Sequence, residues 1–141
     1  MDVIIRAVQV DDIPDMLKMN NEFNDVDCAT VESMRESLEK NKNELVFIAV
    51  NDGKAIGFIC AQLYSSICYT SKQGEITELF VSKSYRRKGI ATMLVNHLEF
   101  ELIKNNVHEI TIITGMKNFN AQKLYEKCGY VHRRMAYVKS A

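Results

Sequence analysis

The segment Glu75–Ala91 reads EITELFVSKSYRRKGIA and joins a strand pattern to a helix pattern. Residues 75–81 are rich in β-forming side chains, and a short basic connection follows them. From Gly89 onward, apolar residues recur with helical spacing as far as Ile103. The segment therefore predicts a strand, a polar turn and a long amphipathic helix.

The start of this helix is a candidate anion site. The first N–H groups of a helix have no partners within the helix and lie at the positive end of its dipole, so an anion placed there satisfies them. Gly89 lets the backbone approach a ligand closely, and Arg86, Arg87 and Lys88 add positive charge. A basic triplet is as often a solvated surface turn, so the segment alone leaves both interpretations open. It has neither the P-loop nor the GxGxxG pattern, which argues against a nicotinamide dinucleotide.

Working outward, the periodicity predicts strands and helices along the whole chain. The Asn51-Asp52-Gly53 turn indicates a hairpin, and Asp11-Asp12 and Thr30 are candidate helix starts. The expected strands are residues 1–8, 45–50, 55–63, 75–81, 109–114 and 130–138, and the expected helices are residues 13–23, 31–38, 89–103 and 121–127. This order predicts one α+β domain over residues 1–141 with a mixed central sheet.

Composition and charge exclude several classes of protein. The chain has 141 residues, and its 18 basic and 18 acidic side chains cancel, which argues against a nucleic-acid binder. The longest apolar stretch, 45–50, is far shorter than the roughly 20 residues of a membrane span, and no secretory signal is visible. The four cysteines form no CxxC pair and no zinc spacing. We therefore expect a cytoplasmic protein with reduced thiols, no metal site and no membrane contact.

Two motifs resemble a known family. Residues 86–91, RRKGIA, match the (Arg/Gln)-x-x-Gly-x-(Gly/Ala) signature of the GNAT superfamily of N-acetyltransferases. Residues 118–130, NFNAQKLYEKCGY, are similar to that family's Asn-x-x-Ala-x-x-Leu-Tyr-x-x-x-Gly-Phe segment. The order of elements agrees with the family along the whole chain. The resemblance implies a single GNAT-like domain whose mixed, mostly antiparallel sheet is flanked by about four helices.

The resemblance also implies acetyl-coenzyme A as co-substrate. Backbone N–H groups of residues 87–92 would bind its pyrophosphate, and the main chain of residues 79–81 would pair with its pantetheine arm. In this family a bulge opens the slot for the cofactor, but no bulge is visible in the sequence. Asn118 would either contact the pantetheine arm or cap a helix. The implied cofactor-binding residues are Leu79, Phe80, Val81, Arg86, Arg87, Lys88, Gly89, Ile90, Ala91, Thr92, Asn118 and Tyr125.

Catalysis would rest on a tyrosine and a carboxylate. Tyr125 matches the family's tyrosine beside the thioester sulfur, and a phenol of pKa ~10 can donate a proton to a leaving thiolate whose thiol has a pKa of ~8.5. Glu75 and Glu78 are candidate bases, since an attacking amine must be neutral. Strand alternation places these two glutamates on opposite faces unless a bulge intervenes. Either one also fits a surface charge near a strand end.

The acceptor would be a primary amine that attacks directly in a ternary complex. Glu22, Asp25 and Asp27, in the connection between the first two helices, join Glu78 in favouring a small cationic amine such as an aminoglycoside or a polyamine. The aminoglycoside case would mean antibiotic resistance. A peptide N-terminus or a protein lysine stays open as the acceptor, as does a catalytically silent acyl-coenzyme A sensor or scaffold. The apolar C-terminal strand could join another chain's sheet edge and form a homodimer.

Overall fold

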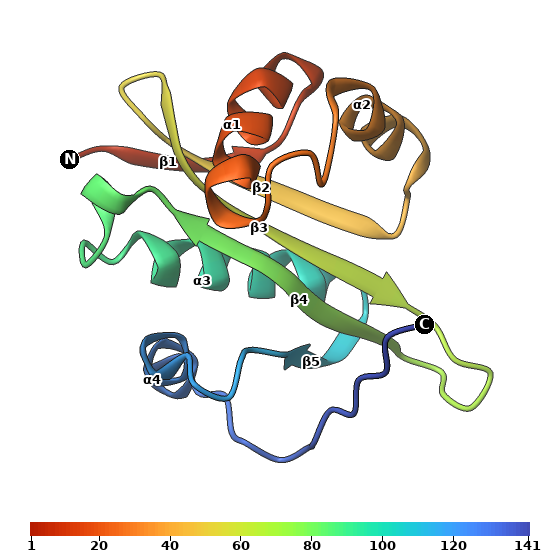
Figure 1. The fold of residues 1–141 in the computed structure, drawn as a ribbon. Helices are drawn as coiled ribbons and strands as arrows, with labels where there is room; N and C mark the ends of the chain where they lie inside the picture. The colour runs from red at the N-terminus through yellow and green to blue at the C-terminus, as the bar shows by residue number, and fades with distance from the viewer.

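The chain forms one five-stranded sheet with helices on both faces (Figure 1). The computed structural model describes residues 1–141. The strands lie in chain order; β1, β2, β3 and β4 pair antiparallel, and β4 pairs with β5 in parallel. The predicted α+β class with a mixed, mostly antiparallel sheet and four helices is therefore confirmed. The elements are β1 (Val3–Ala7), η1 (Val10–Asp12), α1 (Ile13–Phe23), α2 (Val31–Lys40), β2 (Glu44–Asn51), β3 (Lys54–Tyr64), β4 (Lys72–Val81), η2 (Lys83–Tyr85), α3 (Ile90–Lys104), β5 (Val107–Ile112) and α4 (Phe119–Lys127).

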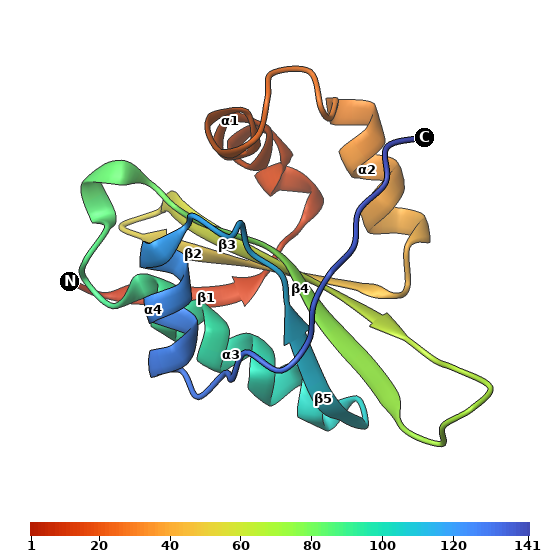
Figure 2. The ribbon, with the colours of Figure 1, turned by 60° about the horizontal axis from the view of Figure 1, so that its bottom comes forward.

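The helix α3 covers one face of the sheet and forms most of the core with it, while α1 and α2 lie on the opposite face (Figures 1 and 2). Successive strand residues point to opposite faces, so Ile59 and Ala61 pack toward α3 and their neighbours Phe58 and Cys60 do not. The buried side of α3 repeats every three to four residues, as an amphipathic helix requires. Its buried residues are Ile90, Leu94, Val95, Leu98 and Leu102.

The helix α1 is held to its face of the sheet by an aromatic cluster. The Phe23 ring lies 5.6 Å from the Phe80 ring and 6.3 Å from the Phe58 ring, between centroids. Asp12 precedes the helix but does not cap it, because its carboxylate accepts from Arg6 and from the Gln9 N–H. These contacts fix where α1 ends and where its connection to α2 begins.

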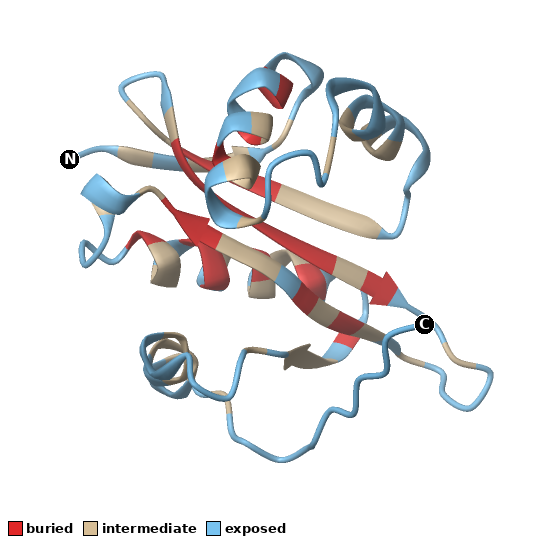
Figure 3. Cartoon of the chain, viewed as in Figure 1, coloured by how far each residue is buried: buried red, intermediate tan, exposed pale blue.

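The helix α2 is packed more loosely. The expected start at Thr30 is confirmed, because Thr30 and Ser33 form a reciprocal capping box. Met34 and Leu38 face the sheet but are only half-buried, and no residue of the helix is fully buried (Figure 3). Space is therefore left between α2 and the sheet.

The C-terminal prediction is wrong: residues 130–138 do not form a strand. Arg133 and Arg134 are consecutive, yet both donate to the Glu109 carboxylate, at 2.9 and 2.7 Å. Consecutive side chains of a strand point to opposite faces, so this double contact is incompatible with a sixth strand. The segment runs along the molecule instead, and β5 is the last strand of the sheet (Figure 2). No helix of the chain is both long enough and apolar enough to cross a membrane.

Candidate active site

A bulge at Thr77 brings two glutamates of β4 to one face of the sheet. Cys60 of β3 pairs with Glu78, but the next residue, Ala61, pairs with Ile76, so Thr77 has no partner. One extra residue in a strand reverses the faces of the residues beyond it. Glu75 and Glu78 therefore both lie on the face that α1 and α2 cover. The sequence predicted opposite faces for Glu75 and Glu78 unless a bulge intervened. The bulge is present, so the two glutamates share a face.

The second half of β4 has a free edge. The strand β5 pairs with β4 only over residues 72–76, ending at Ile76 and Ile112. From Thr77 to Val81 the outer edge of β4 has no strand partner, while its inner edge pairs with β3. The predicted cofactor strand, Leu79-Phe80-Val81, lies in this free stretch. Its main-chain groups are available to an extended ligand in the way that an edge strand is available to another chain.

The free edge of β4 leads through η2 into the N-terminus of α3. Gly89 precedes the helix with φ +82°, and Arg87 also has a positive φ, +61°. No side chain caps this helix start. The Met93 N–H donates to the Gly89 carbonyl at 3.0 Å, so the N–H groups of residues 90–92 come before the first helical bond. Three backbone donors at the positive end of a helix form an anion-binding site.

The three basic residues before Gly89 have two different roles. The Arg86 Nε donates to the Val81 carbonyl at 2.8 Å, and its guanidinium lies 5.8 Å from the Phe80 ring. Arg86 therefore ties the loop to the end of β4. The Lys88 ammonium lies 5.8 Å from the Tyr85 ring, and Arg87 is exposed. The charges of Arg87 and Lys88 remain available beside the helix start.

The tyrosine of the second motif lies half-buried on α4, on the same side of the sheet as α3 (Figure 1). Burial, and the nearby Cys128, raise the pKa of the Tyr125 phenol, so it stays protonated at neutral pH. The position after α4 is fixed by Tyr130, whose hydroxyl donates to the Glu99 carboxylate on α3 at 2.7 Å. Asn118 caps α4, since its side-chain oxygen accepts from the Ala121 N–H at 3.2 Å. That is one of the two roles expected for Asn118.

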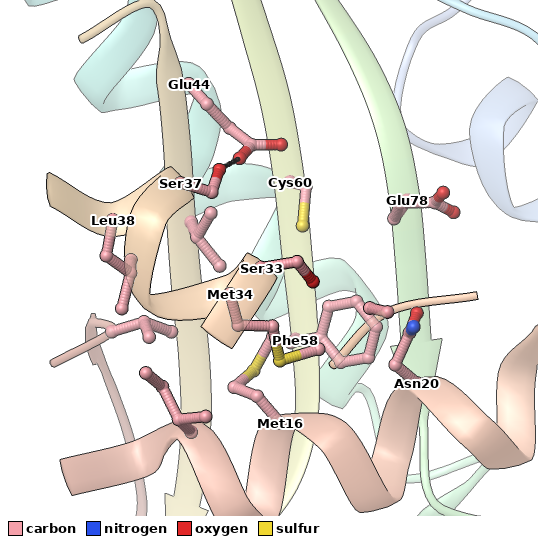
Figure 4. Close-up of a pocket in the computed structure, with 14 residues that line it drawn as sticks. Met16, Asn20, Ser33, Met34, Ser37, Leu38, Glu44, Phe58, Cys60 and Glu78 are labelled. Atoms are coloured by element: carbon pink, nitrogen blue, oxygen red, sulfur yellow. Dashed lines mark hydrogen bonds between the residues drawn. The ribbon is translucent and has the colours of Figure 1, made fainter. Parts of the chain in front are cut away.

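A cavity of about 250 Å³ lies between α1, α2 and the sheet (Figure 4). Nine of its 14 lining residues are hydrophobic, but two are carboxylates, Glu44 and Glu78. In Figure 4 the Glu44 side chain points toward β3, whereas the Glu78 carboxylate lies on the far side of Cys60 and is turned away from Glu44. The sequence analysis did not single out Glu44, because it reads as a polar residue just before an apolar strand.

The two carboxylates of the cavity share an apolar environment. Burial raises the pKa of Glu44, partly offset by hydrogen bonds from Ser37 and Gln62 at 3.3 and 3.1 Å. Burial, together with the charge of Glu44, raises the pKa of Glu78. Burial and these two carboxylates also raise the pKa of the Cys60 thiol well above its usual value. Cys60 is thus a neutral thiol between two acidic groups.

The predicted acceptor-binding carboxylates lie apart from this cavity. Glu22 is exposed on the last turn of α1, and Asp25 and Asp27 are exposed in the connection to α2. None of the three lines the cavity. The structure therefore brings together Glu75 and Glu78 with Glu44, while the loop carboxylates stay a separate, solvated group.

A family model for the acetyltransferase (GNAT) family matches residues 12–130. The chain belongs to the GNAT family. The match includes the free edge of β4, the uncapped start of α3 and Tyr125 on α4. The resemblance drawn from the two motifs is confirmed at the level of the family and its fold.

The curated GNAT relatives include N-terminal acetyltransferases. The chain is 31% identical over 97 residues to N-alpha-acetyltransferase 30 of Xenopus laevis, a match covering 69% of this chain and 35% of that protein. It is 29% identical over 140 residues to an N-alpha-acetyltransferase of Saccharolobus solfataricus, covering 92% of this chain and 80% of that one. This chain therefore spans about a third of the Xenopus laevis protein that it matches.

Solved GNAT structures share the fold at low sequence identity. An aminoglycoside acetyltransferase from an uncultured soil metagenomic sample superposes with a TM-score of 0.88 and 14% identity, covering 99% of this chain and 95% of that one. At this identity the likeness concerns the fold alone. In this GNAT chain, no group of three His, Cys, Asp or Glu side chains is placed to hold a metal ion.

Proposed function

We propose that this chain transfers the acetyl group of acetyl-coenzyme A to a primary amine. The observation that carries the proposal is the continuous path from the free edge of β4, residues 77–81, to the uncapped N-terminus of α3. The edge offers main-chain hydrogen bonds to an extended arm, and the helix start offers N–H donors to a diphosphate. Gly89 supports this fit, because it is exposed and no atom lies within 4 Å of where a Cβ would stand.

The cofactor contacts follow from this path. Acetyl-coenzyme A supplies the acetyl group as a reactive thioester. Main-chain groups of residues 79–81 hold the pantetheine arm, and the N–H groups of residues 87–92 hold the pyrophosphate. Arg87 and Lys88 add positive charge there, while Arg86 keeps the loop against Val81. Asn118 contributes by holding the start of α4, and with it the approach of Tyr125.

In the proposed reaction, Glu78 acts as the base and Tyr125 as the acid. Glu78 takes a proton from the ammonium form of the acceptor, and the lone pair set free forms the new C–N bond at the thioester carbon. The C–S bond breaks, and Tyr125 donates its phenolic proton to the leaving sulfur. The nitrogen then loses its second proton as the amide forms, and this proton restores the Tyr125 phenol through solvent. The raised pKa of Glu78 suits it to accept a proton near neutral pH, and the raised pKa of Tyr125 keeps its proton in place until the sulfur leaves. Glu75 lies on the same face but beside the part of β4 that β5 covers.

A small cationic amine is the first candidate acceptor. Glu44, Glu75 and Glu78 lie on one face of the sheet, and none of them forms an ion pair. Glu22, Asp25 and Asp27 add negative charge at the α1–α2 connection, outside the cavity. A polypeptide N-terminus is the second candidate, because the curated relatives named above are N-alpha-acetyltransferases.

The test combines cofactor binding with an acceptor panel. Acetyl-coenzyme A should raise the melting temperature, since a ligand of the folded state stabilises it. Release of free coenzyme A is then measured with 1,4-diaminobutane, an aminoglycoside, a free lysine side chain and a short peptide with an unblocked N-terminus. Thiol release with at least one amine is expected. Binding of the cofactor without thiol release from any amine would contradict the proposed transfer and favour a non-catalytic acyl-coenzyme A-binding protein.

A further inference from the structure

The cavity beneath α2 is bordered by a loosely packed helix. The helix covers it with Met34 and Leu38, which are only half-buried, and no residue of α2 is fully buried. A space of about 250 Å³ remains between these side chains and the sheet. The space is partly open to solvent and adjoins a candidate base, so it has room for a small ligand.

The walls of the cavity favour an aliphatic chain. Nine of the 14 lining residues are hydrophobic, among them Met16, Met34, Leu38 and Phe58 (Figure 4). At about 30 Å³ for each water, the space holds on the order of eight waters. It lies below the roughly 300 Å³ at which pockets for drug-sized ligands begin. A linear chain of a few carbons fits, whereas an aminoglycoside does not.

Polar groups at the inner end of the cavity favour a cation. Glu44 is half-buried and accepts from Ser37 and Gln62, yet it forms no ion pair. A carboxylate removed from water without a cation is costly, which a cationic ligand would offset. Cys60 adds a small, buried thiol to the wall of the cavity. Its side chain points into the cavity, is only 7% exposed and makes no hydrogen bond with the rest of the chain.

The register of the sheet separates the two carboxylates. Glu44 lies opposite Gln62, and Glu78 lies opposite Cys60, so one carboxylate is on β2 and the other on β4. Two interstrand spacings, combined with an offset of two residues along the strands, put their backbones roughly 12 Å apart. Glu78 is beside the free edge of β4, where the thioester is expected, and Glu44 is at the opposite wall. We propose that the cavity binds the distal end of a linear diamine, with its second ammonium group at Glu44 and its reacting amine at Glu78.

This inference rests on the proposed function and selects among its acceptors. A matched pair of amines tests it: 1,4-diaminobutane, and n-pentylamine, which replaces one ammonium group with a methyl group. The diamine should have the higher kcat/KM by tenfold or more. Shortening it to 1,3-diaminopropane should weaken binding about fourfold, as expected for loss of one buried methylene. Equal or better use of n-pentylamine would overturn the proposal and assign the cavity to an uncharged side chain.

Variants locate the second ammonium group. Glu44→Gln removes the charge and keeps one of the two acceptor oxygens that Ser37 and Gln62 use. It should lower the preference for the diamine over n-pentylamine by about 10- to 100-fold. Glu39→Gln removes the same charge from the exposed side of α2, outside the cavity, and should leave the preference unchanged. Leu38→Phe fills part of the cavity without altering charge and should lower kcat/KM for both amines while changing the preference less than Glu44→Gln does. An unchanged preference in Glu44→Gln would overturn the proposal.

A binding measurement separates this proposal from the transfer itself. The melting temperature of each variant is measured with and without 1,4-diaminobutane, in the absence of acetyl-coenzyme A. A rise in wild type and in Glu39→Gln, but not in Glu44→Gln, supports the diamine site even if no acetyl transfer is detected. If the diamine produces no rise in wild type, the proposal fails, whether or not other amines are acetylated.

Discussion

Glu75 and Glu78 lie on the same face of the sheet although three positions separate them along β4. Their partners across the β3–β4 ladder, Gln62 and Cys60, are two residues apart and so share a face. The extra residue, Thr77, takes up the difference, and its hydroxyl donates to the Cys60 carbonyl at 3.3 Å. The bulge thus sets two carboxylates side by side where β4 loses its outer partner.

The position of the bulge predicts that these two glutamates are not equivalent in catalysis. Glu75 lies beside Thr111 in the paired part of β4, whereas Glu78 lies beside the free edge. Glu78→Gln should lower kcat/KM by about 10²- to 10⁴-fold, the usual contribution of a general base. Glu75→Gln should lower it less than tenfold. Steady-state thiol release measures both, and a larger loss in Glu75→Gln would reverse the assignment of the base.

The same variant should change the pH dependence of the reaction. Burial, and the charge of Glu44, raise the pKa of Glu78 above the ordinary 4.5. A base must be ionised, so kcat/KM should fall as pH drops through this raised value rather than near 4.5. Glu78→Gln should flatten that acidic limb, although the ionisation of the acceptor amine remains. A limb that survives unchanged in Glu78→Gln would belong to another group.

Another prediction compares Tyr125 with Tyr130, which follows Cys128 in the chain. Tyr125→Phe removes the proton donor to the leaving sulfur and should lower kcat about 10²-fold, with the Kd of acetyl-coenzyme A nearly unchanged. Tyr130→Phe is the matched control, because it loses a hydroxyl bound to Glu99 and about 1 kcal/mol of stability without touching the expected thioester. Comparable losses of kcat in the two variants would point to packing of α4 rather than acid catalysis.

Much of the fold followed from periodicity, but the one-residue register shifts between strands did not. The order of elements and the helical stripe of α3 are visible in the spacing of apolar residues. The bulge at Thr77 and the register shift between Ala49 and Val50 are not, because each depends on how two strands meet. The second shift leaves an extra residue on β3 and none on β2, so β2 alternates without interruption and Glu44 shares the face of Val46 and Ile48. Local sequence could therefore name Glu75 and Glu78 but not their common face, and it could not place Glu44 in the cavity.

The C-terminal segment shows the opposite error. Its apolar and β-branched residues predicted a strand over 130–138. A segment with high β propensity forms a strand only if it can pair in register with the edge of a sheet. Arg133 and Arg134 both contact Glu109 instead, which turns two neighbouring side chains the same way. The local β pattern is therefore not sufficient by itself to form a sixth strand.

A third prediction tests the anion site through its glycine. Gly89 has φ +82° and Gly53, in the β2–β3 hairpin, has φ +73°, and a Cβ would meet no atom within 4 Å at either position. Alanine at either site should cost about 1–2 kcal/mol for the left-handed backbone. Only Gly89→Ala should also weaken acetyl-coenzyme A, by tenfold or more in calorimetry, because it disturbs the N–H donors of α3. If Gly89→Ala and Gly53→Ala bind acetyl-coenzyme A with equal affinity, the pyrophosphate does not bind at this helix start.

The last prediction concerns stability and depends on the sign of the Glu44 shift. Burial raises the pKa of Glu44 in the folded protein, so the folded state holds its proton to higher pH than the unfolded state does. The cost of the buried charge is absent below the unfolded pKa of about 4.3. It grows as pH rises through the raised folded value and is fully present above it. Glutamine resembles the protonated form and carries no such cost.

Glu44→Gln should therefore melt above wild type at pH 7, and the two curves should converge as pH falls to about 4. The pKa of Asp12 is lowered mainly by its hydrogen bond with Arg6, so protonation of Asp12 in acid destabilises the folded state. This effect is the same in wild type and Glu44→Gln and cancels from the difference between their melting temperatures. Glu39→Gln, which is exposed, should follow wild type throughout. Saturating 1,4-diaminobutane should reduce or reverse the gap at pH 7, because a cation at Glu44 compensates its charge only in wild type. A Glu44→Gln protein less stable than wild type at neutral pH would show that Glu44 already has its compensation within the chain.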